Sequence, residues 1–217
     1  MTMELFVPAA DAESRRLRLA PGAVLLRGFA NADEAALLAA LNRAVAQAPF
    51  RHMVTPGGLS MSVAMTSCGA WGWVSDTTGY RYDAADPLTG RRWPAMPDAF
   101  RRLAREAAAA AGFAAFVPDA CLINRYEVGA KLSLHQDKDE RDFDQPIVSV
   151  SLGVPALFLF GGSRRADKTL RVPLRHGDVV VWGGPARLNY HGVLPLKAGH
   201  HPRFDGCRIN LTLRKAS

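Results

Sequence analysis

The sequence lacks long apolar runs and has few cysteines. Its 217 residues include no uninterrupted stretch of about 18 apolar residues, so no membrane-spanning helix is expected. The cysteines number three, an odd count, and none forms a Cys-x-x-Cys pair, which argues against a zinc knuckle and against a disulfide scaffold. We expect buried thiols in a reducing compartment at Cys68, Cys121 and Cys207.

Signatures of several other protein classes are also missing. The glycine pairs at 161–162 and 183–184 have no helix-opening Gly-x-Gly-x-x-Gly context, so we interpret them as turns and not as phosphate-binding loops. The first 19 residues mix Glu4, Asp11 and Glu13 with a few apolar residues and lack the basic-then-apolar order of a secretory signal. We therefore expect a cytoplasmic protein.

The charge balance is positive. Lysine and arginine together number 27 against 20 acidic residues, which gives a net charge of +7, and arginine far outnumbers lysine. A positive field favours polyanions such as nucleic acid, although many basic proteins bind none. The length suits one domain with a sizeable core, and 48% hydrophobic residues are typical of a soluble globular protein.

Two amphipathic helices are expected in the first half of the chain. Residues 32–48 carry apolar positions at helical spacing behind Asn31, which is suited to an N-cap. Residues 97–112 form the second helix, with Pro97 in its first turn and Gly112 at its end. Both helices are expected to pack against a sheet.

The remaining segments have a different texture. Residues 51–96 set aromatic side chains among turn residues, which predicts an irregular and partly exposed layer. From residue 120 onward, short strands alternate with glycine- and proline-containing turns. This pattern predicts a mainly β fold with flanking helices (α+β), built as a sandwich, barrel or jelly roll. The expected strands are 121–126, 147–153, 156–160, 169–174, 178–184 and 207–214.

One short stretch, LSLHQDKDE at 132–140, has the composition of a metal site. Residues two apart on a strand share a face, so His135 and Asp137 can point at one atom. His191 follows a later apolar strand and offers a third ligand. Two histidines and one carboxylate match the facial triad of non-haem Fe(II) oxygenases and also match a catalytic zinc site. The other histidines need no metal.

Polar residues on the last strand suggest an anion beside that metal. One face of residues 208–214 is polar and the other is apolar, which by itself is equally typical of a strand with one face in water. Asn124 and Tyr126 form a second polar pair two residues apart. If the fold places these two strands on either side of the metal cluster, Arg208 and Arg214 are buried beside it, and buried cations need a paired anion. A small dicarboxylate that chelates the metal and meets an arginine would satisfy them.

Several segments together resemble the AlkB family of Fe(II)- and 2-oxoglutarate-dependent nucleic-acid demethylases, especially its bacterial DNA-repair members. The resemblance runs from about residue 20 to the end of the chain. The segments are MVTPGG, MSVAMT, WPAMP, PDACLINRY, GAKLSLHQDKDE, PIVSVSLG, HGDVVVWGG and RINLTLR. The resemblance implies a single domain with a double-stranded β-helix (jelly-roll) core at about 118–217 and a nucleotide-recognition lid at about 51–96.

The resemblance also implies a ligand set. Fe(II) would be held by His135, Asp137 and His191. The co-substrate 2-oxoglutarate would be held by Asn124, Tyr126, Arg208, Asn210 and Arg214. Within this set, the resemblance gives the distal carboxylate to Arg214 with help from Tyr126, and places Arg208 and Asn124 nearer the metal.

Contacts with the nucleic-acid substrate come from the same resemblance. A flipped base would be sandwiched between Trp73 and His135, and Tyr80 would touch backbone phosphate. Asp139 continues the register of His135, and its carboxylate would favour a cationic methylated base. The remaining substrate contacts implied are Met65, Ser149 and Arg165. In contrast, Glu140 is interpreted as part of a solvated turn, and Gln136 and Lys138 as facing away.

The activity expected is oxidative demethylation of 1-methyladenine and 3-methylcytosine in DNA, or also in RNA, by a monomer. Each turnover would consume O₂, convert 2-oxoglutarate to succinate and CO₂, and release formaldehyde, which amounts to direct reversal of alkylation damage. Two alternatives remain open. One is an oxygenase that acts mainly on RNA or protein, and the other is a non-enzymatic nucleic-acid-binding module with a structural metal.

Overall fold

The computed structural model describes residues 15–217. The expectation that no secretory signal precedes the domain rests largely on residues 1–14, which lie outside the described residues. Within 15–217, no helix is long and apolar enough to cross a membrane. The three cysteines are free thiols; Cys68 and Cys121 are buried as expected, whereas Cys207 is only partly buried.

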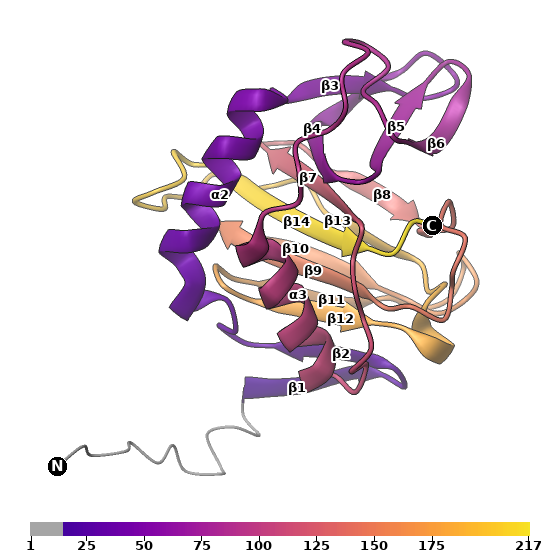
Figure 1. The fold of residues 1–217 in the computed structure, drawn as a ribbon. Helices are drawn as coiled ribbons and strands as arrows, with labels where there is room; N and C mark the ends of the chain where they lie inside the picture. The colour runs from indigo at the N-terminus through magenta and orange to yellow at the C-terminus, as the bar shows by residue number, and fades with distance from the viewer. Residues whose placement is uncertain (1–14) are drawn as a thin grey trace, which may run out of the picture.

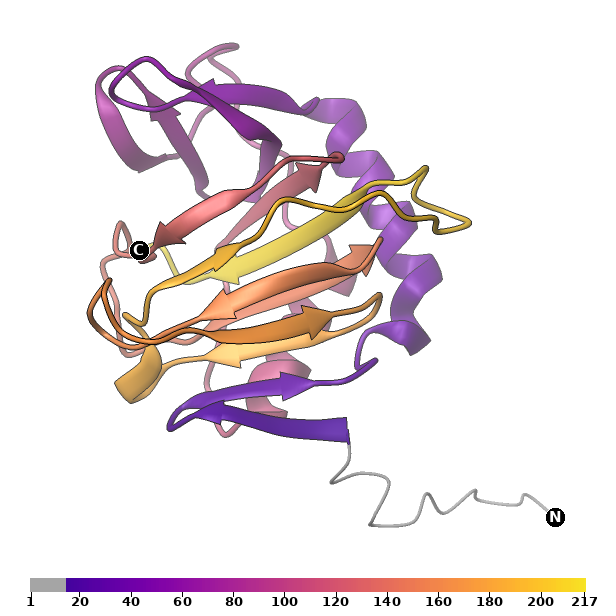
Figure 2. The same ribbon diagram turned by 180° about the vertical axis from the view of Figure 1, so that it is seen from behind.

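Two antiparallel sheets face each other and form the jelly roll (Figures 1 and 2). The large sheet has the order β1 (Arg16–Ala20), β2 (Ala23–Leu26), β12 (Val179–Trp182), β9 (Ile147–Gly153), β14 (Arg208–Arg214), β7 (Ala120–Tyr126), β4 (Ser60–Gly69) and β3 (Arg51–Val54). The small sheet has the order β11 (Leu170–Leu174), β10 (Ala156–Phe160), β13 (His191–Val193) and β8 (Leu132–His135). The expected mainly β fold is confirmed.

The central strands of the large sheet are buried on both faces. Two helices, α2 (Glu34–Gln47) and α3 (Asp98–Ala110), cover its outer face, as Figure 1 shows, while the small sheet lies on the other side in Figure 2. Because side chains alternate along a strand, β12 sends Val179 and Val181 toward the helices and Val180 and Trp182 toward the small sheet. Burial on both faces explains why this strand is apolar at every position.

The first helix begins differently from the prediction. A short 3-10 turn, η1 (Asn31–Asp33), precedes α2, whose N-cap position is Asp33 and makes no side-chain capping bond. Asn31 is therefore not the cap. Its side chain instead lies against two glycines: a Cβ on Gly177 would overlap Asn31 Oδ1, and a Cβ on Gly28 would be 2.9 Å from Asn31 Nδ2. The second helix lies within its expected bounds.

The segment 51–96 is more regular than predicted. It forms β3, β4 and a separate two-stranded sheet, β5 (Gly72–Asp76) with β6 (Gly79–Asp83). Trp93, which comes after these strands, is buried and donates its indole N–H to the Asp83 carbonyl at 3.0 Å. A Cβ at Gly72 would lie 2.3 Å from the Trp93 ring, so this close packing requires glycine.

Candidate metal centre and anion pocket

The three expected metal ligands lie together where the neighbouring strands β8 and β13 pair and the loop after β8 begins. His135 is the last residue of β8, His191 is the first of β13, and the two are direct partners in the strand register. Asp137 Oδ1 is 3.7 Å from His135 Nε2, and Asp137 Oδ2 is 3.5 Å from His191 Nε2. One potential ligand atom from each residue lies within 4.8 Å of the others.

The strand alternation from which His135, Asp137 and Asp139 were expected to share one face was partly wrong. The strand ends at His135, so Asp137 and Asp139 lie in the loop that follows and are not placed by strand alternation. Both acids nevertheless line the same cavity as His135. Gln136 and Lys138 line it too, which corrects the expectation that they face away, and Gln136 Nε2 donates to the Leu188 carbonyl at 2.6 Å.

The histidine tautomers favour a metal at this point. His135 Nδ1 lies 2.8 Å from the Ser133 carbonyl oxygen, and His191 Nδ1 lies 3.0 Å from the Asn189 carbonyl oxygen. Because a carbonyl can only accept, each Nδ1 carries a proton, and in the neutral form of each ring the lone pair that a metal needs is on Nε2, the atom near Asp137. Burial, with His191 as the second cause, lowers the pKa of His135 to about 4, so this imidazole is neutral at pH 7.

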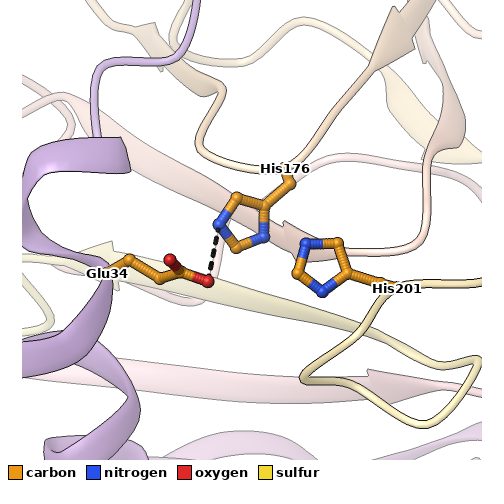
Figure 3. A group of neighbouring side chains, drawn as sticks. All are labelled: Glu34, His176 and His201. Atoms are coloured by element: carbon orange, nitrogen blue, oxygen red, sulfur yellow. Dashed lines mark ion pairs between the residues drawn. The ribbon is translucent and has the colours of Figure 1, made fainter.

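A second group of possible ligands, Glu34, His176 and His201, does not fit a metal (Figure 3). His176 Nδ1 accepts the Gly153 backbone N–H at 3.0 Å, and His201 Nδ1 accepts the Arg203 N–H at 3.3 Å. Each neutral ring must therefore hold its proton on Nε2, the atom that a metal would need. His176 Nε2 instead lies 3.4 Å from Glu34 Oε1, and the two rings stack at 4.4 Å.

The carboxylate of the triad is kept ionised by an arginine. Burial opposes ionisation of Asp137, but the guanidinium of Arg214 and the two histidines hold the pKa of this carboxyl well below its usual range. Arg214 Nη2 donates to Asp137 Oδ2 at 2.6 Å. Arg214 therefore lies beside the metal ligands and not at the distal end of the anion pocket, which corrects the role suggested by resemblance.

Arg208 lies at the other end of β14, and its guanidinium has few hydrogen-bond partners for a buried charge. It is 1% exposed, and only its Nη2 makes a hydrogen bond, to Ser151 Oγ at 2.9 Å, while its Cζ lies 4.9 Å from the Tyr126 ring centre. Within residues 15–217, Arg208 Nε and Nη1 and Asn124 Oδ1 are buried without a hydrogen-bond partner. Burial lowers the pKa of Arg208. A buried, underpaired guanidinium fits a pocket that awaits an anion.

The polar faces of two strands form the wall of this pocket. β7 and β14 pair directly, with Asn210 opposite Asn124 and Arg208 opposite Tyr126, so they lie side by side in the large sheet and not on either side of the triad. Every residue of β14 is buried, which rejects the interpretation of its polar face as solvent-exposed. Asn210 Nδ2 donates to Ser149 Oγ at 2.8 Å and so stiffens the wall.

All the site residues expected from the sequence line one cavity of about 670 Å³. Those from residues 118–217 are Asn124, Tyr126, His135, Asp137, Asp139, Ser149, Arg165, His191, Arg208, Asn210 and Arg214. Those from 51–96 are Met65, Trp73 and Tyr80. The sheets thus bring a candidate metal centre, an anion pocket and aromatic side chains to one opening.

The aromatic rim is already in contact with the acidic loop. Trp73 and Tyr80 stack with ring centres 5.6 Å apart and planes 15° apart, and Tyr80 is 47% exposed. The indole N–H of Trp73 donates to Asp139 Oδ2 at 2.7 Å. Arg165 Cζ lies 5.9 Å from the Tyr190 ring centre at the same rim. This rim can offer a flat apolar surface, a carboxylate and a cation together.

Sequence reasoning missed a buried ionic group behind the triad. Glu140 is 5% exposed and bonds Arg187 and Tyr82, so it does not belong to a solvated turn. The polar run in which it lies gave no periodic signal of burial. Its partners, Tyr82 and Arg187, come from distant segments of the chain. The one signal in the sequence was that Arg187 follows an apolar strand and a turn, which favours a structural role.

Comparisons with known proteins agree with this site. The model of the 2OG-Fe(II) oxygenase superfamily matches residues 22–214. The chain is 61% identical over 199 residues to the alpha-ketoglutarate-dependent dioxygenase AlkB of Salmonella typhimurium, with 92% of each chain covered. It is 30% identical over 174 residues to the DNA N(6)-methyladenine demethylase ALKBH1C of Arabidopsis thaliana, covering 68% of this chain and 38% of that protein. The solved structure of OsALKBH1 superposes with a TM-score of 0.78 at 30% identity, covering 92% and 99% of the two chains.

Proposed function

The chain belongs to the AlkB family within the 2OG-Fe(II) oxygenase superfamily, and we propose that it removes methyl groups oxidatively from 1-methyladenine and 3-methylcytosine in DNA. It is therefore a dioxygenase that uses Fe(II), 2-oxoglutarate and O₂. The observation that carries the substrate proposal is the joining of a metal triad, an anion pocket and a stacked aromatic rim around one cavity. Its demethylase relative supports the same chemistry.

His135, Asp137 and His191 would hold the iron, because one potential ligand atom of each lies within 4.8 Å of the others and each Nδ1 is turned to a backbone carbonyl. When bound, the iron with 2-oxoglutarate and O₂ supplies the oxidation of the N-methyl carbon, with succinate, CO₂ and formaldehyde as products. The protein then binds the iron and the co-substrate, orients the methylated base, and keeps the carboxylate of Asp137 ionised through Arg214.

The co-substrate would lie along β7 and β14. We assign its distal carboxylate to Arg208 beside Tyr126, because Arg208 has two buried N–H groups without partners. Arg214 would act at the end near the metal, where it already bonds Asp137. Asn124 and Asn210 would complete the polar wall between the arginines. A dicarboxylate would balance the Arg208 charge that burial otherwise disfavours.

The methylated base would stack between Trp73 and His135. Both side chains line the cavity, and stacking of about 1–3 kcal/mol offsets much of the cost of unstacking a base from DNA. Tyr80 and Arg165 would contact the phosphate backbone, with Met65 and Ser149 on the pocket wall. Asp139 would favour bases that carry positive charge, since one of its oxygens bonds Trp73 and the other is left for the base.

These roles imply a simple organisation. Residues 51–96 would serve as a nucleotide-recognition lid on a jelly-roll core at about 118–217, within a single domain. In this segment β3 and β4 extend the large sheet, and β5 and β6 form the separate sheet. One lid and one core complete the proposed site, so the active form would be a monomer. The free thiols support a reducing compartment such as the cytoplasm. The basic net charge of +7 supports a polyanionic substrate, and both single- and double-stranded DNA remain within this proposal.

The test is turnover on defined oligonucleotides. Iron is loaded anaerobically, O₂ and 2-oxoglutarate are added, and formaldehyde and succinate are measured with 1-methyladenine or 3-methylcytosine in single-stranded DNA, double-stranded DNA or tRNA. We expect formaldehyde from at least one DNA substrate. Higher turnover on tRNA would redirect the proposal to RNA, and inactivity on all three would reject a nucleic-acid substrate. No succinate under any condition would favour a binding module.

A variant pair tests the role of Asp139. Asp139→Asn should lower kcat/KM more for a cationic base such as 1-methyladenine than for a neutral alkylated base, because the carboxylate favours positive charge. Asp144→Asn is the matched control, since Asp144 is an exposed acid five residues further along and does not line the cavity. An equal loss for both bases would show that Asp139 does not read charge.

A further inference from the structure

Four buried charged side chains and a half-buried tyrosine form a network that includes Asp137 and extends behind the metal triad. Its two acids and two arginines balance in charge, and their side chains are between 1% and 8% exposed. A tyrosine hydroxyl from β6 completes it. The members are Tyr82, Asp137, Glu140, Arg187 and Arg214.

Glu140 is the centre of this network. Its Oε1 accepts the Tyr82 hydroxyl at 2.6 Å and lies 3.4 Å from Arg214 Nε, and its Oε2 accepts Arg187 Nη2 at 3.0 Å. Arg187 Nη1 also donates to the backbone carbonyl of Asp137 at 2.8 Å. The same glutamate thus orients both the arginine that holds the Asp137 side chain and the arginine that holds its backbone.

Tyr82 gives Arg214 a partner other than Asp137. Its hydroxyl accepts from Arg214 Nη1 at 3.1 Å while donating to Glu140. Burial raises the pKa of Tyr82 well above its ordinary value, so the hydroxyl remains a donor. Within residues 15–217, Tyr82, Glu140 and Arg187 do not line the cavity, so they act only through other residues.

We propose that Tyr82 and Glu140 are positioning residues that share Arg214 with Asp137, Tyr82 through a hydrogen bond and Glu140 through an ion pair, while Arg187 holds Glu140 in place, so that Asp137 stays available to a divalent metal. Arg214 and the metal compete for the same carboxylate. With Tyr82 and Glu140 in place, Arg214 divides its hydrogen bonds between Asp137 and the Tyr82 hydroxyl, and its charge is shared between two carboxylates. Without Tyr82 and Glu140, Arg214 would interact with Asp137 alone, and this stronger interaction would weaken metal binding.

The experiment titrates metal-free protein with Co²⁺ and follows the absorption of the bound ion, without nucleic acid. Tyr82→Phe keeps the ring and removes only the hydroxyl, and we expect its Kd for Co²⁺ to rise roughly 10-fold, as is typical for partners of metal ligands. Glu140→Gln leaves two arginines against one carboxylate, so a larger rise is expected. In turnover, the apparent requirement for Fe(II) should rise more than kcat falls.

A matched control separates positioning from simple loosening of the lid. Asp86→Asn breaks the partly buried ion pair between Asp86 and Arg51, at 2.6 Å, in the same segment as Tyr82 but without contact to Arg214. We expect it to lower stability and leave the Co²⁺ affinity unchanged. Wild-type Co²⁺ affinity in Tyr82→Phe, or an equal loss in Asp86→Asn, would overturn the proposal.

This proposal depends on the metal centre and not on the nucleic-acid substrate. Co²⁺ binding is measured without any base, so failure of DNA demethylation would leave its outcome unaffected. If Glu140→Gln does not fold, Tyr82→Phe still decides, because it removes one oxygen atom and retains the packing of the aromatic ring.

Discussion

Replacing Arg208 by methionine should change stability and binding in opposite ways. In the ligand-free protein, the substitution removes one hydrogen bond to Ser151 and the contact with the Tyr126 ring, which together cost about 1–3 kcal/mol. It also removes a buried guanidinium with two orphaned N–H groups, whose burial costs several kcal/mol. The second effect is larger, so the ligand-free variant should be at least as stable as wild type.

The effect on 2-oxoglutarate is the reverse. If Arg208 Nε and Nη1 both bind the distal carboxylate, two charge-assisted hydrogen bonds of about 1.5–3 kcal/mol each are lost. The sum of about 3–6 kcal/mol corresponds to roughly 10²- to 10⁴-fold weaker binding. Succinate, which has the same distal carboxylate, should lose affinity by a similar factor.

Two measurements on the same protein decide the matter. Urea unfolding without metal or co-substrate gives the free energy of unfolding, and calorimetric titration of the Mn²⁺-loaded protein gives the Kd for 2-oxoglutarate. Arg171→Met, at an exposed arginine of β11, is the control and should leave both quantities near wild type. Wild-type affinity in Arg208→Met, or a loss of several kcal/mol in stability, would refute the assignment of Arg208 to the anion.

Three further predictions follow from the same geometry. Asp137→Ala should abolish Co²⁺ binding and turnover, and metal-dependent turnover that survives would remove the triad. Asp139→Ala removes the acceptor of the Trp73 indole N–H and should shift the part of the tryptophan emission that is lost in a Trp73→Phe control; an unchanged spectrum would contradict that bond in solution. The pKa of His176 is lowered from 6.5, chiefly by burial and then by His201, so the unfolded state binds more protons than the folded state. The contribution of His176 to stability is therefore complete above pH 6.5 and is lost as the pH falls below it. His176→Asn, which can still accept the Gly153 N–H, should flatten that fall in urea unfolding, and an unchanged slope would assign it elsewhere.

Strand positions could be predicted because they depend on local pattern. The runs 147–153 and 156–160 coincide with β9 and β10, since apolar residues bounded by glycine and proline leave few other structures. Residues 51–96 were harder. Their strands are stabilised by pairing between distant residues, and Gly72 is required by the approach of Trp93, which no local pattern reveals.

The sequence by itself determined which residue types could do the chemistry. His135, Asp137 and His191 are a metal-binding set wherever they meet, and the alternation along 208–214 puts both arginines on one face of a strand. The family resemblance added the identity of the metal and the co-substrate. These inferences need only covalent geometry and side-chain chemistry.

Tertiary structure decided what each of these residues faces. β8 and β13 of the small sheet pair at His135 and His191. The large sheet that faces them brings the Arg214 end of β14, and not the Arg208 end, to Asp137. That choice depends on how two sheets pack, and residues six positions apart on one strand are indistinguishable by alternation. The backbone oxygens that set the histidine tautomers, and the burial of Glu140, likewise exist only once distant segments meet, because hydrogen bonds and desolvation act through space and not along the chain.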